Sequence, residues 1–218
     1  MFHTEALQDT DYTEIVSLLN SGGVIAFPTD TAYGLGADPF NDAAIARIFE
    51  IKGRDERKPL LLLVDSIAMA ESVSHPSMSR PGPDTFYALA QKFWPGPLTV
   101  ILPASQQIPT KLTAGTNTIG IRWPAAAFAT NLLERFGKPI TATSANRSGM
   151  PSPVTAAEVG SQLGESTDAL IDGGILPARS GSTLLDLTVD PPVMLREGPI
   201  GFQGLSEFFH GRIRRQVA

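Results

Sequence analysis

Short apolar runs alternate along this chain with stretches in which apolar residues recur every third or fourth position. A short apolar run predicts a buried strand, and the helical spacing predicts an amphipathic helix. The predicted strands cover residues 24–27, 60–64, 98–102, 118–123, 139–143, 169–171, 183–188 and 193–196. The predicted helices cover residues 12–20, 85–92 and 155–163, a stretch between Asn41 and Gly53, and a stretch with Phe128, Leu132 and Phe136 on one face.

The alternation of strands and helices predicts the α/β class. The later strands follow one another with less chain between them, so a mixed sheet is expected rather than a parallel one. We see no repeat and no linker between two large domains, and we expect a single domain over residues 1–218 with its core at about 12–200. A basic tail follows, with Arg212, Arg214 and Arg215, and we expect it to be solvated and outside any site.

Composition narrows the class of protein. The 218 residues carry a formal charge of −5 and the pI is near 5.2, which argues against a general nucleic-acid coat protein. A groove can still be positive on an acidic protein. The chain has no cysteine, so disulfides, thiolate metal sites and a cysteine nucleophile are excluded.

The N-terminal residues lack the basic and apolar regions of a signal peptide. The longest aliphatic run, Leu60 to Val64, is too short to span a bilayer. We therefore expect a protein of the cytoplasm that does not enter a membrane.

Several catalytic motifs are absent or incomplete. Gly34-Leu-Gly36 starts like a dinucleotide fingerprint, but Pro39 stands where the third glycine belongs. Gly137-Lys138 lacks the earlier glycine of a phosphate-binding loop, and no G-x-S-x-G elbow occurs. The three histidines have no metal-ligand spacing. The chain therefore offers neither a histidine base nor a protein-built metal site.

Two loops carry candidate chemistry. The segment from Pro28 to Gly36 gathers three hydroxyls and two glycines after a strand, which suits either a small polar substrate or a tight hydrogen-bonded turn. The run from Lys52 to Lys58 places lysine point charges and arginine forks where phosphate could bind. The alternative for this run is a solvated basic loop, with Lys52 beside the negative end of a helix.

Polar groups also recur where the other predicted strands end. If Ile119 and Ile121 face the core, then Thr118, Gly120 and Arg122 share the opposite face, where the arginine could bind a carboxylate or be a plain edge charge. The strand-end groups are Thr31, Thr118, Arg122, Thr143, Ser144, Ser182 and Arg196. Their convergence favours a site for a polyanion that works by positioning and charge stabilisation.

Five motifs follow one another in a fixed order: Pro28 to Gly36, Lys52-x-Arg54 with Pro59-Leu60, Trp94 to Thr99, Ser144-x-Asn146-x-Ser-Gly149, and Ser182 to Asp186. In this order and spacing the chain resembles the YrdC-type family, over roughly residues 12–200. The resemblance implies an α/β domain with a twisted mixed β-sheet flanked by helices and a positively charged concave face. Longer members have a second domain, and we expect this chain to be the short, single-domain form.

The resemblance also implies a reaction. L-Threonine and bicarbonate would give a carbamate that attacks the α-phosphate of ATP, which yields threonylcarbamoyl-AMP and pyrophosphate. Mg²⁺ would be bound through the ATP phosphates, with no metal ligands from the protein. A downstream transfer enzyme would pass the threonylcarbamoyl group to tRNA, and tRNA itself is a possible contact. Phosphoryl-type transfer needs alignment and neutralised charge, so the missing nucleophile is no objection.

Residue roles carry over by position. Lys52 and Arg54 would be catalytic. The ATP-binding residues would be Arg54, Lys58, Thr118, Ser144, Asn146 and Arg196, and the threonine-binding residues Thr31, Arg122, Thr143 and Ser182. Leu63 stands where some members have a histidine, so threonine binding there can differ. Two rivals stay open: a paralogue of the same fold that binds structured RNA, and a carbamoyl-transfer enzyme for another amine.

Overall fold

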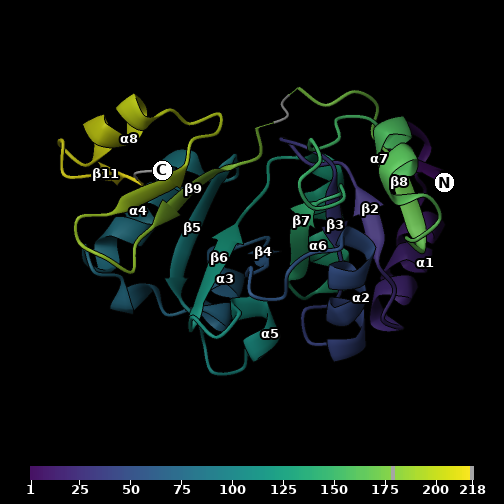
Figure 1. Cartoon of the computed structure of the whole chain (residues 1–218), viewed down its shortest axis with the longest axis horizontal. Coiled ribbons are helices and arrows are strands. Elements are labelled where there is room, and N and C mark those ends of the chain that lie inside the picture. Colours follow the sequence, from purple (N-terminus) through teal and green to yellow (C-terminus); the bar gives the residue numbers. More distant parts are fainter. Residues whose placement is uncertain (178–179, 217–218) are drawn as a thin grey trace.

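The computed structural model describes residues 1–177 and 180–216, and the eleven strands in these ranges form one mixed sheet. The strand order is β1-β8-β2-β3-β7-β4-β6-β5-β9-β10-β11. The strands are β1 Phe2–His3, β2 Ile25–Phe27, β3 Gly34–Gly36, β4 Leu61–Leu63, β5 Leu98–Pro103, β6 Thr118–Arg122, β7 Ile140–Ser144, β8 Ala169–Asp172, β9 Thr183–Asp186, β10 Val193–Arg196 and β11 Arg214–Arg215. The first and last strands lie at opposite edges, so the two chain ends lie at opposite ends of the molecule (Figure 1).

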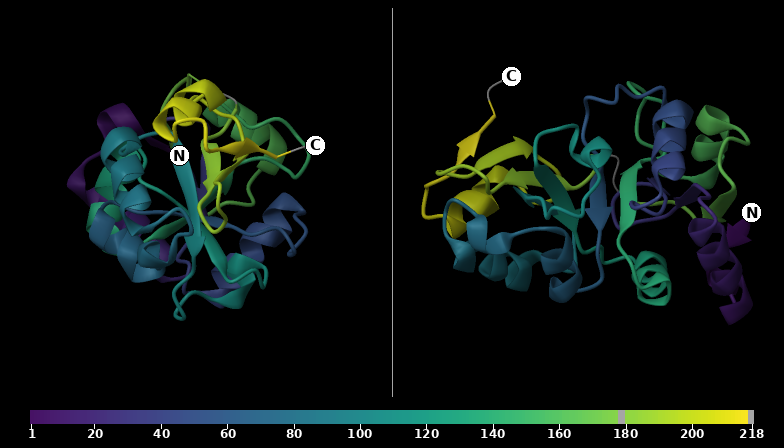
Figure 2. Two further views of the ribbon diagram at one scale, coloured as in Figure 1. Left: turned by 90° about the vertical axis from the view of Figure 1, so that its left-hand side faces the viewer. Right: turned by 90° about the horizontal axis from the view of Figure 1, so that it is seen from below.

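Helices cover both faces of the sheet, with α2 and α7 on one side and α1 and α6 on the other (Figure 2). The α-helices are α1 Asp9–Asn20, α2 Asp42–Lys52, α3 Ile67–Val73, α4 Pro83–Phe93, α5 Thr110–Thr113, α6 Ala127–Phe136, α7 Ala156–Leu163 and α8 Phe202–Phe208, and two 3-10 turns are η1 Thr4–Ala6 and η2 Pro76–Met78. The predicted α/β class with a mixed sheet is confirmed.

The bounds of α2 follow from its capping residues. The Asn41 side chain accepts hydrogen bonds from the backbone N–H groups of Ala43 and Ala44, which would otherwise lack partners. Gly53 ends the helix in the left-handed conformation, at φ 56°, which costs glycine little. Lys52 is therefore the last helical residue, and the rest of the basic run forms the loop between α2 and β4.

Strand β3 lies inside the segment that the sequence indicated to be a loop. It pairs antiparallel with β2, with Phe27 opposite Gly34. Strand propensity did not predict β3, because two of its three residues are glycine. Packing requires glycine at position 36, since a Cβ there would lie 2.6 Å from the Phe27 ring.

The arginines of the basic tail are exposed, as predicted, but the backbone that carries Arg214 and Arg215 belongs to the sheet. Arg214 and Arg215 form β11, which pairs parallel with β10, and Ile213 is buried in the main core. The two arginine side chains remain exposed, and Gln216 reaches the cavity described below. The sequence alone shows only charge here, and the edge pairing that orders the tail is a tertiary contact.

Candidate active site

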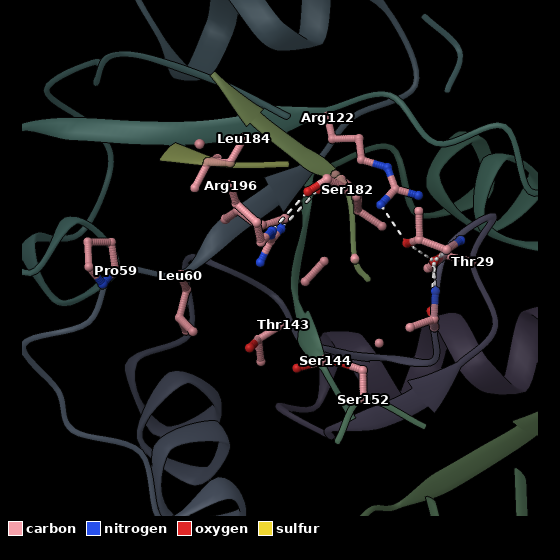
Figure 3. A pocket seen from close by; sticks show the side chains of 18 of the residues that line it. Thr29, Pro59, Leu60, Arg122, Thr143, Ser144, Ser152, Ser182, Leu184 and Arg196 are labelled. Carbon is pink, nitrogen blue, oxygen red and sulfur yellow. Dashed lines mark hydrogen bonds between the residues drawn. The ribbon is translucent and has the colours of Figure 1, made fainter. Parts of the chain in front are cut away.

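A cavity of about 770 Å³, here called the central cavity, opens over one face of the sheet (Figure 3). Its floor is a row of residues that the register aligns across four neighbouring strands: Ala142, Leu61, Gly120 and Ile101. On β6, Ile119 and Ile121 face the core, while Gly120 and Arg122 line the cavity, as the alternation predicts. The volume suits a small-molecule site.

The cavity brings together most of the residues that the sequence singled out. Those that line it are Thr31, Arg54, Lys58, Arg122, Thr143, Ser144, Ser182 and Arg196. They come from loops and strand ends that are far apart in the sequence. Three other candidates, Lys52, Thr118 and Asn146, are not among the lining residues.

The lining is cationic. Arg54 and Lys58 enter from the loop after α2, Arg122 from the end of β6 and Arg196 from the end of β10. No described lining residue is an aspartate or glutamate. An anion with several charged groups therefore finds cations on more than one wall.

Arg122 is the most deeply buried of these cations, and its side chain is 5% exposed. Its Nη1 donates to the Thr31 hydroxyl at 2.9 Å, and Nη2 donates to the Asp30 carboxylate. The Thr29 hydroxyl lies 3.1 Å from that of Thr31 and steadies it. Burial lowers the pKa of Arg122 and Asp30 opposes the change, so the guanidinium keeps its charge.

A second cation faces the same hydroxyl region. Arg196 donates through Nε to the Ser182 carbonyl at 2.9 Å and through Nη2 to its hydroxyl at 3.3 Å. Beneath Ser182, the buried Thr99 hydroxyl lies 2.6 Å from its Oγ. Burial is the main cause that lowers the pKa of Arg196, and the nearby positive charge of Arg122 is the second. The two guanidiniums are therefore close enough to repel each other. Figure 3 shows Arg122 and Arg196 beside Ser182, across the cavity from Thr143.

The loop after α2 divides its charges between the cavity and the surface. Arg54 reaches the cavity, and its Nη2 donates to the Pro59 carbonyl at 3.0 Å. Arg57 instead forms an ion pair with Asp55 at 2.7 Å and does not line the cavity. Lys58 lines the cavity and is exposed. The basic run is thus split into two cavity cations and one surface ion pair.

Lys52 lies behind the cavity wall and is 2% exposed. Its Nζ donates to the Ser144 carbonyl, to the Asn146 carbonyl at 2.8 Å and to Asn146 Oδ1 at 3.3 Å. Burial, with the charge of Arg54 as a lesser cause, lowers the pKa of Lys52 to about 7. The lysine therefore ties the end of β7 to the end of α2.

The other two candidates outside the lining have local partners. Thr118 begins β6, and its hydroxyl lies 2.9 Å from that of Thr116. Asn146 is buried, and its Nδ2 donates to the Met150 carbonyl at 2.6 Å. Ligand roles for both residues remain predictions.

The residues that sequence reasoning did not single out include Ser152 and Gln216, which line the cavity, and Thr99, which lies beneath the lining residue Ser182. Ser152 lines the cavity from between two prolines, and nothing in the local pattern marks that serine. Gln216 reaches it only because β11 pairs with β10. Thr99 was visible as part of a motif, but its place under Ser182 depends on β5 pairing with β9.

Gly198 closes against the Ser182 segment, and we expect Gly198→Ala to lower the free energy of unfolding by about 1–3 kcal/mol. A Cβ there would lie 2.5 Å from the Thr183 nitrogen and 2.7 Å from the Gly181 carbonyl oxygen. Backbone atoms on both sides leave little room to adjust. Urea unfolding of the variant tests this, with Gly204→Ala in α8 as control, because its Cβ would meet nothing within 4 Å. A neutral Gly198→Ala would contradict the packing described here.

Among residues 1–177 and 180–216, no three histidine, aspartate or glutamate side chains converge to hold a metal ion. No helix in the same ranges has the length and apolar character to cross a membrane.

Fold and cavity together define an α/β protein with a cationic, hydroxyl-lined cavity on one face of its sheet. The Sua5/YciO/YrdC family model, described as telomere recombination, matches residues 17–198, and the chain belongs to this family. The predicted family membership is therefore confirmed.

Relatives within the family are similar to this chain over most of its length. The chain is 37% identical over 210 residues to a threonylcarbamoyl-AMP synthase of Pyrococcus abyssi. That alignment covers 96% of this chain and 60% of the relative. The chain is 40% identical over 169 residues to a threonylcarbamoyl-AMP synthase of Thiobacillus denitrificans, with 78% and 87% covered. The chain thus spans about 60% of the length of the P. abyssi relative.

Solved structures agree with the fold. P. abyssi Sua5 in complex with L-threonine superposes with a TM-score of 0.92 at 36% identity, over 99% of this chain and 62% of that one. Escherichia coli YciO superposes with a TM-score of 0.80 at 28% identity, over 91% and 94%.

Proposed function

We propose that this protein is an L-threonylcarbamoyl-AMP synthase, which makes threonylcarbamoyl-AMP and pyrophosphate from L-threonine, bicarbonate and ATP. One observation carries the proposal: a single cavity, with no carboxylate among its described lining residues, joins a buried arginine–hydroxyl end to accessible cations from other elements. The names of the relatives, and the threonine complex of the P. abyssi structure, support this choice of substrates.

The end around Arg122 suits the amino acid. A guanidinium binds a carboxylate with charge-assisted hydrogen bonds, and burial strengthens them. Thr31 is already oriented by Arg122, while Ser182 and Thr143 offer hydroxyls for the remaining polar groups. Leu63 also lines the cavity, so this part of the wall is apolar.

The remaining cavity cations suit the triphosphate. Arg54, Lys58 and Arg196 would neutralise phosphate oxygens, and Ser144 would bind the nucleotide. For Lys52 and Asn146 we propose a contribution through the shape of the 144–146 turn, which the lysine holds. Thr118 would assist from outside the lining.

The proposed reaction balances without a protein nucleophile. The ammonium group of threonine first loses a proton. Its nitrogen then bonds to the carbon of bicarbonate, and a C–O bond of bicarbonate breaks with loss of water to give the carbamate. A carbamate oxygen then attacks the α-phosphorus, its bond to oxygen forms, and the bond to the β-phosphate oxygen breaks as pyrophosphate leaves. Arginine and lysine charges stabilise the extra negative charge of this transition state. Mg²⁺ enters as MgATP, which fits a described chain without a cluster of metal ligands.

Arg54→Ala is expected to lower kcat/KM for ATP by about ten- to a hundredfold, because it removes a cavity cation. Arg57→Ala is the matched control, since Arg57 has the same charge in the same loop but pairs with Asp55 at the surface. We expect Arg57→Ala to change the rate less than about threefold. Equal losses in the two variants would show that the loop acts through its overall charge.

The proposal is tested by incubating the protein with ATP, labelled bicarbonate and either L-threonine or L-serine. An adenylate that carries label and forms with threonine supports it, and faster incorporation with another amine would favour the carbamoyl-transfer rival. Salt-sensitive binding of tRNA without any adenylate would favour the RNA-binding paralogue. The proposed product would pass to a transfer enzyme that modifies tRNA.

A further inference from the structure

Asp30 lies beside the central cavity, and only one of its two carboxylate oxygens has a hydrogen-bond partner. One of its oxygens, Oδ1, accepts from Arg122 Nη2, while Oδ2 is buried and has no hydrogen-bond partner. Arg122 likewise has an unpartnered buried atom, Nε. The ion pair therefore leaves one acceptor and one donor unused at the same place.

Unused buried polar groups are costly, because each has lost its water without gaining a partner. Here the pair is joined by a single bond, although an arginine and a carboxylate commonly form two. A ligand with a hydrogen-bond donor for Asp30 Oδ2 and an acceptor for Arg122 Nε would supply the missing partner of each atom.

A positively charged group of a ligand finds no carboxylate partner among the described lining residues. None of the described lining residues is acidic, and Arg54, Lys58, Arg122 and Arg196 would all repel an ammonium. Asp30 is the carboxylate bonded to one of these cations, and it lies between Thr29 and Thr31, which both line the cavity. Its side chain is 17% exposed while Oδ2 is itself covered, so a ligand that bonds to Oδ2 has to displace what covers that atom.

We infer that Asp30 binds the α-amino group of the amino-acid substrate and so selects α-amino acids over simple carboxylates. The inference rests on the proposed function and adds a substrate-binding residue to it. An α-amino acid carries its carboxylate and its amine on neighbouring atoms. A carboxylate bound by Arg122 thus places the amine beside the group that Arg122 already holds.

This arrangement also orients the amine. With its carboxylate on Arg122 and its nitrogen on Asp30, the substrate has two anchored groups and a defined direction for the nitrogen lone pair once a proton is lost. The Thr29 hydroxyl, which donates to the Ala32 carbonyl at 2.7 Å, fixes the loop that carries Asp30.

The test measures dissociation constants for L-threonine, (R)-3-hydroxybutyrate and ATP by calorimetry. The second ligand is threonine without its amine. The proteins are wild type, Asp30→Asn and Asp38→Asn. Asp38 is a matched control, because it is a buried carboxylate paired with Lys138 at 2.9 Å and does not line the cavity. Thermal melts report whether each variant folds.

We expect Asp30→Asn to weaken L-threonine by about ten- to a hundredfold, the usual worth of a hydrogen bond to a charged group. Affinity for ATP and for 3-hydroxybutyrate should stay within about threefold of wild type, and Asp38→Asn should change none of the three. An unchanged threonine affinity would overturn the inference. Parallel weakening of threonine and 3-hydroxybutyrate would also overturn it, since Asp30 would then act only by holding Arg122. Failure of wild type to bind threonine would instead contradict the proposed function.

Discussion

Arg122→Lys should raise KM for L-threonine by roughly a hundredfold, which corresponds to about 2–3 kcal/mol of lost binding. The guanidinium donates to Thr31 and Asp30 from two different nitrogens, and a lysine ammonium cannot reproduce that fork. Lysine is preferred to alanine for this test, because alanine would leave Asp30 without its counter-ion. The measurement is initial rate against threonine concentration at saturating ATP.

The control for this prediction is Arg47→Lys. Arg47 forms a two-bond ion pair with Asp168, at 2.7 and 3.1 Å, and does not line the cavity. We expect that variant to keep the wild-type KM. A normal threonine KM in Arg122→Lys would mean that the substrate carboxylate binds elsewhere.

Lys52→Met is expected to lower kcat/KM by about a hundredfold, the cost of misplacing a positioned group by about 1 Å. The variant removes the donor to three oxygens of Ser144 and Asn146, so the end of β7 loses its fixed shape. Unfolding should also become easier by about 1–3 kcal/mol, because those acceptors stay buried. A variant with normal turnover would refute the role of Lys52.

The lowered pKa of Lys52 gives this prediction a pH dependence. The pKa of Lys52 is about 7 in the folded protein and 10.5 for an ordinary lysine, so the unfolded chain binds more protons between these pH values. Stability of wild type relative to Lys52→Met should therefore rise as pH increases from 7 to 9, by up to about 1.4 kcal/mol per unit. A flat difference would show that the three acceptors keep the ammonium charged throughout.

Local signals predicted the parts of the fold that local physics determines. Asn41 and Gly53 set the ends of α2, and the alternation of Ile119, Gly120 and Ile121 assigned the two faces of β6. The sequence did not reveal β3 or β11. Glycines conceal the first, and the second exists only because β10 offers its edge.

The candidate site was predictable in its chemistry and less so in its geometry. Strand-end hydroxyls and arginines converge as expected, because the sheet brings their strand ends together. The sequence could not show that Lys52 donates to oxygens of Ser144 and Asn146 and does not line the cavity, nor that Asp30 is the partner of Arg122. Both facts depend on contacts between residues far apart in the chain: Lys52 and Asn146 are 94 positions apart, and Asp30 and Arg122 are 92 positions apart.

The central claim is that this cavity joins three substrates, and pyrophosphate release measures it most directly. Purified protein is given MgATP with threonine and bicarbonate together, with each alone, and with neither. The account predicts release only when both are present, and its loss in Arg54→Ala but not in Arg57→Ala. Release that ignores threonine or bicarbonate, or none at all from protein that binds ATP, would contradict it.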